Sequence, residues 1–210
     1  MRNELFHPDV QLDTLYIPYI YREIYDENIY ADIFNQNYDT VIDVGANIGI
    51  VTEYMRDYAK KVYAIEPSSE HFAALKKNKE FYNWDNVEIF NIAIADRDGE
   101  MKLSKCNENR TMHSLINDFK QDSELVKTMA MDTFFDMNNI ENVDFMKFDV
   151  EGAEDLILRS EGFKKVTNKI KAIEIEFHGS SCKELVDYMQ ELGYKAKRML
   201  ADAMIVLFRR

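Results

Sequence analysis

The chain has 210 residues, a formal net charge of -12 and 46% hydrophobic residues. This length fits one domain with an appended segment, and the composition is that of a globular protein rather than a disordered one. The acidic balance argues against general binding to a phosphate backbone, which relies on dense Lys and Arg, so nucleic acid is disfavoured as a partner.

The two cysteines, Cys106 and Cys182, have no paired ligand spacing and fit free thiols in a reducing compartment. The N-terminus lacks the apolar run of a signal peptide. No stretch is apolar over the length that crosses a bilayer. We therefore predict a cytoplasmic protein that does not act in a membrane.

Taken in chain order, the first 38 residues are rich in Tyr, Ile and Asp, and their spacing predicts a helix over 19–34. Strands and helices then alternate. The predicted strands cover residues 41–44, 61–65, 87–94, 100–104, 143–150 and 169–177, followed by a hairpin of 194–199 and 203–209. The predicted helices cover residues 50–58, 67–82, 129–137 (capped by Asp132), 153–160 and 182–192. Residues 105–127 are polar and receive no assignment.

This alternation predicts an α/β fold with a mostly parallel sheet, helices on both faces and a C-terminal antiparallel hairpin at one edge. We expect residues 1–38 to form an N-terminal helical extension or cap. Residues 39–210 would then form the main domain.

The most informative segment is 41–49, Val-Ile-Asp-Val-Gly-Ala-Asn-Ile-Gly, where an apolar strand runs into a glycine turn. Glu66 ends the next strand roughly 20 residues on, where a ribose-binding carboxylate is expected. A dinucleotide fingerprint needs three glycines, but Asn47 and Ile50 stand at the second and third positions, and a side chain at Asn47 obstructs a pyrophosphate. The pattern favours S-adenosylmethionine, a nucleoside cofactor without a pyrophosphate. The competing interpretation is that Gly45 and Gly49 only make a tight turn.

In this interpretation the turn offers backbone N–H groups to the carboxylate of the cofactor, and Asp43 or a carbonyl takes its ammonium group. Glu66 can accept hydrogen bonds from both ribose hydroxyls, because an ionised carboxylate has two acceptor oxygens.

Four segments together resemble the FkbM-type methyltransferases: 43–49, Glu66-Pro67, 91–100 and 143–154, the last ending in Lys-Phe-Asp-Val-Glu-Gly-Ala-Glu. The resemblance covers about residues 39–180. It implies a seven-stranded, Rossmann-like class I methyltransferase fold that uses S-adenosylmethionine. The better understood members resemble O-methyltransferases acting on hydroxyls of natural products or sugars.

Carried over by position, the resemblance assigns cofactor-binding roles along the chain. The methionine end would be held by Asp43, Gly45, Asn47, Ile48 and Gly49. Glu66 would hold the ribose, with Pro67 and Ser68 shaping the adenine pocket. Ala93 and Ile94 would border the adenine, and Asp149 would lie beside the reacting methyl group.

The catalytic candidates follow two neighbouring strands: Asp149 and Glu151 after one, His178 after the next. Ligands of open α/β sheets lie at the carboxyl ends of strands, where these residues fall. A hydroxyl acceptor must lose a proton, and His178 has the most suitable ordinary pKa for a general base. Its alternative is an ordinary loop histidine.

A metal is a second way to activate the hydroxyl. Asp149 and Glu151, with Glu176 or His178, could hold magnesium or manganese. Carboxylates also favour the first turn of a helix, and we prefer that role for Glu151 and Glu154, so no metal ligands are assigned.

The leading hypothesis is an S-adenosylmethionine-dependent O-methyltransferase with a small-molecule or glycan acceptor. The alternatives are a methyltransferase for protein or RNA, a non-catalytic module that binds the nucleoside cofactor, and a nicotinamide-dependent dehydrogenase, which Asn47 disfavours. His113-Ser114 is either part of a lid over the acceptor or a surface loop. The N-terminal tyrosines wall an acceptor pocket, pack against the domain or form a homodimer contact.

Overall fold

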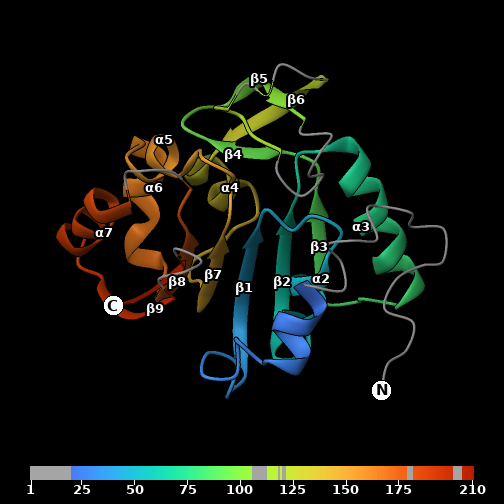
Figure 1. The fold of residues 1–210 in the computed structure, drawn as a ribbon, viewed down its shortest axis with the longest axis horizontal. Coiled ribbons are helices and arrows are strands. Elements are labelled where there is room, and N and C mark those ends of the chain that lie inside the picture. Colours follow the sequence, from blue (N-terminus) through green and yellow to red (C-terminus); the bar gives the residue numbers. More distant parts are fainter. Residues whose placement is uncertain (1–19, 106–112, 118, 120–121, 179–181, 201–204) are drawn as a thin grey trace.

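The computed structural model describes residues 20–105, 113–117, 119, 122–178, 182–200 and 205–210. Its centre is a seven-stranded sheet in the order β3-β2-β1-β7-β8-β10-β9 (Figure 1). The strands are β1 (Tyr38–Val44), β2 (Ala59–Ile65), β3 (Val87–Phe90), β7 (Phe145–Phe148), β8 (Ala172–Glu176), β9 (Lys195–Leu200) and β10 (Ile205–Arg209). Neighbours from β3 to β8 are parallel, whereas β10 is antiparallel to both β8 and β9. The predicted Rossmann-like α/β fold with a C-terminal antiparallel hairpin is confirmed, although residues 203 and 204 of the hairpin lie outside the described residues.

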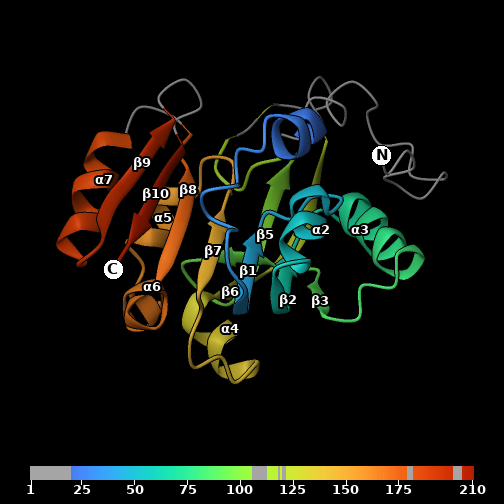
Figure 2. The ribbon, with the colours of Figure 1, turned by 90° about the horizontal axis from the view of Figure 1, so that it is seen from below.

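Helices cover both faces of this sheet (Figure 2). They are α2 (Ile50–Arg56), α3 (Ser69–Phe81), α4 (Met131–Met137), α5 (Glu154–Leu158), α6 (Glu161–Val166) and α7 (Cys182–Glu191), with the short turns η1 (Arg22–Asp26) and η2 (Thr167–Lys169). Strand β1 shows the division, because successive side chains point to opposite faces. Ile42 packs with α4 to α7, whereas Val41 packs with α2, α3 and the N-terminal segment. With both faces covered, a ligand can reach the sheet only at the ends of its strands.

The apolar run predicted as one strand over 87–94 is divided between two sheets. After β3 the chain leaves the large sheet, and β4 (Ala93–Ala95) joins a three-stranded sheet in the order β4-β6-β5, with β5 (Gly99–Ser104) and β6 (Ser123–Ala130). Asn91 lies at the break and donates hydrogen bonds to the carbonyls of Glu66 and Pro67. The hydrophobic pattern of the sequence continues through this break, so the pattern could not predict where the chain passes from one sheet to the other.

Strand β6 lies largely in the polar stretch that received no assignment. Only alternate residues of its second half face inward, Val126, Thr128 and Ala130, and the rest is exposed or half-buried. β6 is the central strand of this small sheet, but only one of its faces is buried, so its sequence carries a weak apolar signal.

Three helix predictions are wrong in detail. The N-terminal helix ends at Asp26 instead of continuing to residue 34, because Asn28 adopts a left-handed conformation (φ 52°) that interrupts a right-handed helix. Residues 153–160 belong to two helices, since Ser160 accepts a hydrogen bond from Phe163 N and starts α6. The residue that caps α4 is Ala130, whereas the Asp132 carboxylate pairs with Lys165.

The N-terminal segment packs directly on the sheet. Ile24, Tyr30, Ile33 and Phe34 are buried in the same cluster as Val41 of β1. Of the predicted tyrosines, Tyr30 packs in this cluster, whereas Tyr21 and Tyr25 are half-buried. Tyr16 and Tyr19 lie outside the described residues. Within the described part of the chain, no helix combines the length and apolar character of a bilayer span. Cys182 is a free thiol, and Cys106 lies outside the described residues.

Candidate active site

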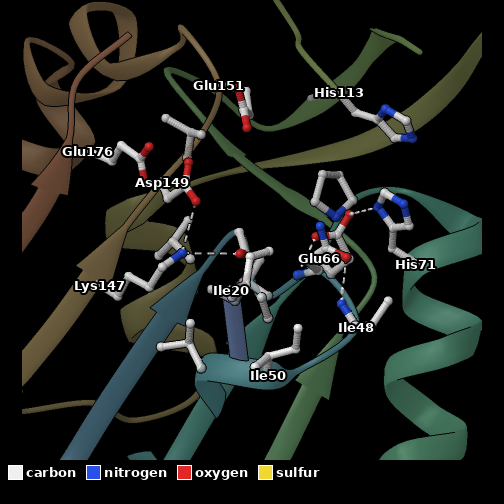
Figure 3. Close-up of a pocket in the computed structure, with 18 of the residues that line it drawn as sticks. Ile20, Ile48, Ile50, Glu66, His71, His113, Lys147, Asp149, Glu151 and Glu176 are labelled. Atoms are coloured by element: carbon white, nitrogen blue, oxygen red, sulfur yellow. Dashed lines mark hydrogen bonds and ion pairs between the residues drawn. The ribbon is translucent and has the colours of Figure 1, made fainter. Parts of the chain in front are cut away.

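A cavity of about 310 Å³ opens at the carboxyl ends of β1, β2, β7 and β8 (Figure 3). One end is lined by the glycine turn after β1, by Glu66-Pro67 and by residues 92–94. The other end is lined by Lys147, residues 149–151 and Glu176. Ile20, Glu23, Ile24, Ile29 and Tyr30 of the N-terminal segment also line the cavity. We call the first end the nucleoside end and the second the acceptor end.

The glycine turn brings the chain close to the acceptor end. A Cβ atom on Gly45 (φ 81°) would lie 1.9 Å from the carbonyl oxygen of Asp149, so only glycine fits there. The backbone N–H groups of Gly45 and Ala46 both donate to the Ile65 carbonyl, and that of Ile48 donates to Asn47 Oδ1. These N–H groups therefore already have acceptors within the protein, and a cofactor carboxylate needs a different partner here.

The carboxylate of Glu66, at the nucleoside end, is held by two backbone hydrogen bonds. Its Oε2 accepts from Asn47 N and its Oε1 from Ser68 N, both at 2.8 Å, and it is 5% exposed. The second lone pair of each oxygen is free to accept a further bond. Ser68 is fully buried and begins α3 by accepting from His71 N, so it acts on the cavity through Glu66.

Two histidines that the sequence interpretation did not place at this end form part of its wall. The rings of His71 and His113 stack with centroids 4.6 Å apart, and His71 Nδ1 lies 3.8 Å from Glu66 Oε1. The next residue, Ser114, is buried and its hydroxyl donates to the Glu151 carbonyl at 2.5 Å. The described residues 113–117 thus contact both ends of the cavity. The burial of Ser114 argues against a plain surface loop, and a lid over the acceptor stays a prediction.

Lys147 is the buried cation of the cavity, and sequence reasoning missed it as a functional residue. Register pairs it with Asp43 on β1 and with Glu174 on β8, which gives three adjacent buried charges of alternating sign. Its Nζ lies 3.1 Å from Asp149 Oδ2 and 3.8 Å from Asp43 Oδ1. Burial lowers the pKa of Lys147, but the charges of Asp149 and Asp43 outweigh it and raise that pKa above its ordinary value. A lysine between Met146 and Phe148 on a buried strand was the available signal, because lysine is rarely buried without a role.

Asp43, predicted to hold the methionine end, is the β1 member of this row and does not line the cavity. It is fully buried and is held by Thr52 Oγ1 at 2.5 Å, and burial raises its pKa despite Lys147 and Thr52. Its contact with the cavity therefore runs through Lys147. Gly49 also lies behind the wall, where a Cβ would come within 3 Å of Leu75 and Trp84.

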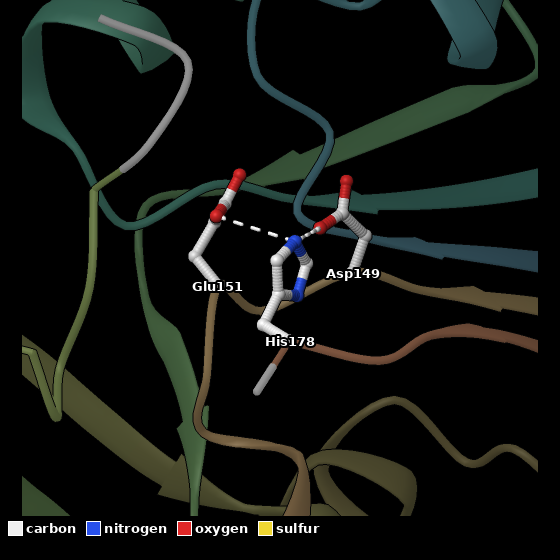
Figure 4. A group of neighbouring side chains, drawn as sticks. All are labelled: Asp149, Glu151 and His178. Carbon is white, nitrogen blue, oxygen red and sulfur yellow. Dashed lines mark ion pairs between the residues drawn. The ribbon is translucent and has the colours of Figure 1, made fainter. Parts of the chain in front are cut away.

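At the acceptor end, Asp149, Glu151 and His178 converge (Figure 4). His178 Nε2 lies 3.3 Å from Glu151 Oε2, 3.7 Å from Glu176 Oε1 and 4.0 Å from Asp149 Oδ1. Its Nδ1 lies 2.8 Å from Oε1 of the buried Glu154. His178 does not line the cavity itself but contacts Glu151, which does.

The crowding of carboxylates shifts the proton affinities of this cluster. Burial, followed by the charge of Asp149, raises the pKa of both Glu151 and Glu176. Burial lowers the pKa of His178, but the hydrogen bond to Glu154 and the charges of Glu151 and Asp149 raise it to about 9. An isolated cluster thus keeps its imidazole protonated at neutral pH, so the base role predicted for His178 requires that proton to leave.

The structure therefore brings most of the predicted site residues to one cavity. Its lining includes Gly45, Asn47, Ile48, Glu66, Pro67, Ala93, Ile94, Asp149 and Glu151. Asp43, Gly49, Ser68 and His178 lie one layer behind.

The sheet order, with one antiparallel strand near the edge, and the cavity at the carboxyl ends define a class I methyltransferase fold. The chain matches the methyltransferase FkbM domain over residues 43–196 and belongs to that family. The resemblance drawn from its motifs is confirmed.

Two relatives illustrate how far the similarity extends. Methyltransferase 1 of Beauveria bassiana (strain ARSEF 2860) is 26% identical over 168 residues, which cover 69% of this chain and 67% of that protein. A Thermococcus sibiricus protein described as a ribosomal RNA small subunit methyltransferase A is 43% identical, but only over 54 residues, which cover 26% of this chain and 19% of that protein.

Two solved structures share the fold. Methyltransferase FkbM from Methylobacillus flagellatus KT has a TM-score of 0.56 at 16% identity, over 82% of this chain and 44% of that one. M. capricolum TrmK in complex with S-adenosylhomocysteine has a TM-score of 0.55 at 15% identity, over 88% of this chain and 67% of that one. The chain thus spans less than half of the FkbM structure.

Proposed function

We propose that this methyltransferase uses S-adenosylmethionine to methylate a hydroxyl group of a small molecule, natural product or sugar. One observation carries the proposal: a single cavity has a ribose-type carboxylate, Glu66, at one end and the Asp149–Glu151–His178 cluster at the other. The cofactor assignment is supported by family membership and by the S-adenosylhomocysteine bound to a structural neighbour.

The residues at the nucleoside end fit this cofactor. Glu66 offers an acceptor to each ribose hydroxyl, and Pro67, Ile92, Ala93 and Ile94 offer apolar walls for the adenine. Lys147 offers a cation to the cofactor carboxylate, in place of the backbone N–H groups that are already occupied. Asp43 would then serve by holding Lys147, and Asp149 would stand between Lys147 and the acceptor.

The bound cofactor supplies an electrophilic methyl group on a sulfonium. An oxygen–carbon bond would form as the sulfur–carbon bond breaks, and the proton of the hydroxyl would pass to a carboxylate of the cluster at the acceptor end. The protein contributes mainly by holding the two reactants in line and by accepting that proton. Ile20, Ile24 and Tyr30 would pack against the body of the acceptor.

The charge of the cavity favours a compact acceptor over a polyanion. Glu23, Asp149, Glu151 and Glu176 all line it, and these carboxylates would repel a phosphate backbone. RNA nevertheless remains the main alternative, since the short match to the Thermococcus protein points to that class. A protein acceptor and a module without catalysis are the other two.

Calorimetric titration with S-adenosylmethionine and S-adenosylhomocysteine tests the cofactor. Glu66→Gln should weaken binding about ten- to a hundredfold, the loss expected for hydrogen bonds to a charged group. Glu100→Gln on the exposed face of β5 is the matched control and should bind like the native chain. A native protein that binds neither compound would overturn the proposal.

Transfer of a radiolabelled methyl group then separates the acceptors. We expect label on one class of small hydroxyl compounds, retained as a methyl ether. Label only in RNA or only in protein would move the assignment to that class. Binding of the cofactor without transfer to any acceptor would favour the non-catalytic module.

A further inference from the structure

We propose that Asp149, Glu151 and His178 form a binding site for one divalent cation, of the manganese type, at the acceptor end of the cavity. Only the catalytic use of the cation rests on the proposed function. The binding itself is a property of these three side chains.

The spacing of the three side chains suits a common ion. One ligand atom from each lies within 4.8 Å of the others, and His178 Nε2 is 3.3 Å from Glu151 Oε2 and 4.0 Å from Asp149 Oδ1. Ligands held about 2.1 Å from one octahedral ion lie about 3 Å apart when adjacent and about 4.2 Å apart when opposite. The two distances from His178 Nε2 fall in that interval, and the ligand atoms of Asp149 and Glu151 lie within 4.8 Å of each other, so coordination needs only small rotations of side chains.

The histidine is held in the orientation that a ligand requires. Glu154, which is outside the proposed ligand set and 2% exposed, accepts from the Nδ1–H of His178 at 2.8 Å and from Gly152 N at 3.1 Å. An ionised carboxylate only accepts, so Nδ1 carries a proton. When a cation displaces the second proton of the imidazolium, the lone pair of Nε2 faces Asp149 and Glu151. A buried carboxylate behind a histidine is the usual support of a metal-binding imidazole.

Asp149 provides an independent observation. Its Oδ2 is paired with Lys147, but its Oδ1 is buried and has no hydrogen-bond partner among the described residues. A buried carboxylate oxygen without a partner costs free energy. A cation among the three side chains would compensate that oxygen together with Glu151.

The second carboxylate is also held in place. Glu151 has a left-handed backbone (φ 52°), and its carbonyl accepts from Ser114 Oγ and Asn117 Nδ2. Glu176 Oε1, 3.7 Å from His178 Nε2, is near enough to join directly or through water. One imidazole with several carboxylates suits manganese better than magnesium, which prefers oxygen ligands alone.

In the proposed reaction, the cation would bind the acceptor oxygen and lower the pKa of its hydroxyl. The proton would pass to Glu176, the neighbouring carboxylate outside the three ligands, before or during methyl transfer. The acceptor would then be a compound whose hydroxyl can reach the ion, with a neighbouring oxygen as a second donor.

The test is a titration of tag-free, EDTA-treated full chain with Mn²⁺ alone, followed by the electron paramagnetic resonance signal of free Mn²⁺. We expect one ion bound per chain. Glu151→Gln and His178→Ala should each weaken binding at least tenfold, and Asp149→Asn should do the same if either variant fails to fold. Glu100→Gln, on the exposed face of β5, is the matched carboxylate control and should bind like the native chain.

The site is overturned if native protein binds no Mn²⁺ at millimolar concentration, or if the variants bind as well as the native chain. Titration of the same EDTA-treated protein with S-adenosylhomocysteine separates this result from the proposed function. Cofactor binding without Mn²⁺ binding would remove the cation site alone, whereas Mn²⁺ binding without cofactor binding would remove the proposed function alone.

Discussion

The two ends of the cavity differ in how their charges are satisfied. At the nucleoside end, Glu66 accepts hydrogen bonds from Asn47 N and Ser68 N, which come from its own segment or from the neighbouring turn. At the acceptor end, Asp149, Glu151 and Glu176 surround one imidazole, and proton affinities are raised. The first arrangement suits a rigid binding site. The second stores unfavourable charge that a proton, a cation or a substrate can relieve, which is how reactive sites are commonly built.

The largest expected loss of stability comes from a side chain at Gly45, where the glycine turn of the nucleoside end touches the Asp149 backbone of the acceptor end. Gly45→Ala places a Cβ 1.9 Å from the Asp149 carbonyl, so the free energy of unfolding should fall by about 3 kcal/mol or more and cofactor binding should be lost. Gly193→Ala is the control, because it has a similar φ of 90° but its nearest atom is Arg210 Nη1 at 3.7 Å. It should cost only about 1–2 kcal/mol of backbone strain. Equal stability of the two variants in urea denaturation would contradict the steric argument.

The next largest expected loss of stability concerns the row of buried charges formed by Asp43, Lys147 and Glu174. Lys147→Met leaves Asp43 and Glu174 buried beside an apolar side chain, and breaking such a pairing typically costs about 3–5 kcal/mol of unfolding free energy. Lys102→Met on the exposed face of β5 should change stability by less than about 0.5 kcal/mol. If Lys147→Met were as stable as the control, Lys147 would not be needed to balance the row.

Ser114→Ala should impair the acceptor end of the cavity and leave cofactor binding at the nucleoside end unchanged. The hydroxyl holds the Glu151 carbonyl and accepts from Ile116 N and Asn117 N, so its loss should loosen Glu151 without touching Glu66. We expect kcat to fall about tenfold, as for a loss of roughly 1.4 kcal/mol, with the Kd for S-adenosylhomocysteine unchanged. Ser123→Ala, at the exposed start of β6, is the control. A weaker cofactor affinity at unchanged kcat would mean that residues 113–117 serve the nucleoside end instead.

The smallest expected effect on stability concerns Asp144, which lies just before β7, at the ends of the strands opposite the cavity. Burial raises the pKa of Asp144, but hydrogen bonds from Lys171, Thr40 N and Asp39 N outweigh it and hold that pKa below its ordinary value. A lowered pKa contributes stability above the unfolded value of about 3.9 that is lost as the pH falls through the folded value. Asp144→Asn should therefore cost about 1 kcal/mol at pH 7, discounted for the exposed Lys171, and progressively less below about pH 4. A difference from native that stays constant between pH 7 and pH 3 would contradict this linkage.

Particular residues show how far local patterns can be trusted. The alternation of strands and helices predicted the large sheet, because each element buries a continuous apolar face. The same reasoning joined β3 to β4, since hydrophobicity does not record that Asn91 turns the chain toward Glu66. It also extended the N-terminal helix past Asn28, whose left-handed backbone (φ 52°) the helical spacing does not record.

Much of the nucleoside end could be predicted from the sequence by itself, although the stacked rings of His71 and His113 in its wall could not. Its glycine turn and Glu66 lie within one strand–helix–strand unit, so the short spacing along the chain dictates their spacing in space. The acceptor end was decided by the tertiary structure. Ser114 meets Glu151 across 37 positions, and His178 meets Glu154 across 24. Contacts of that kind arise only when separate strands end at the same edge of the sheet, and no local pattern encodes which side chains will then face one another.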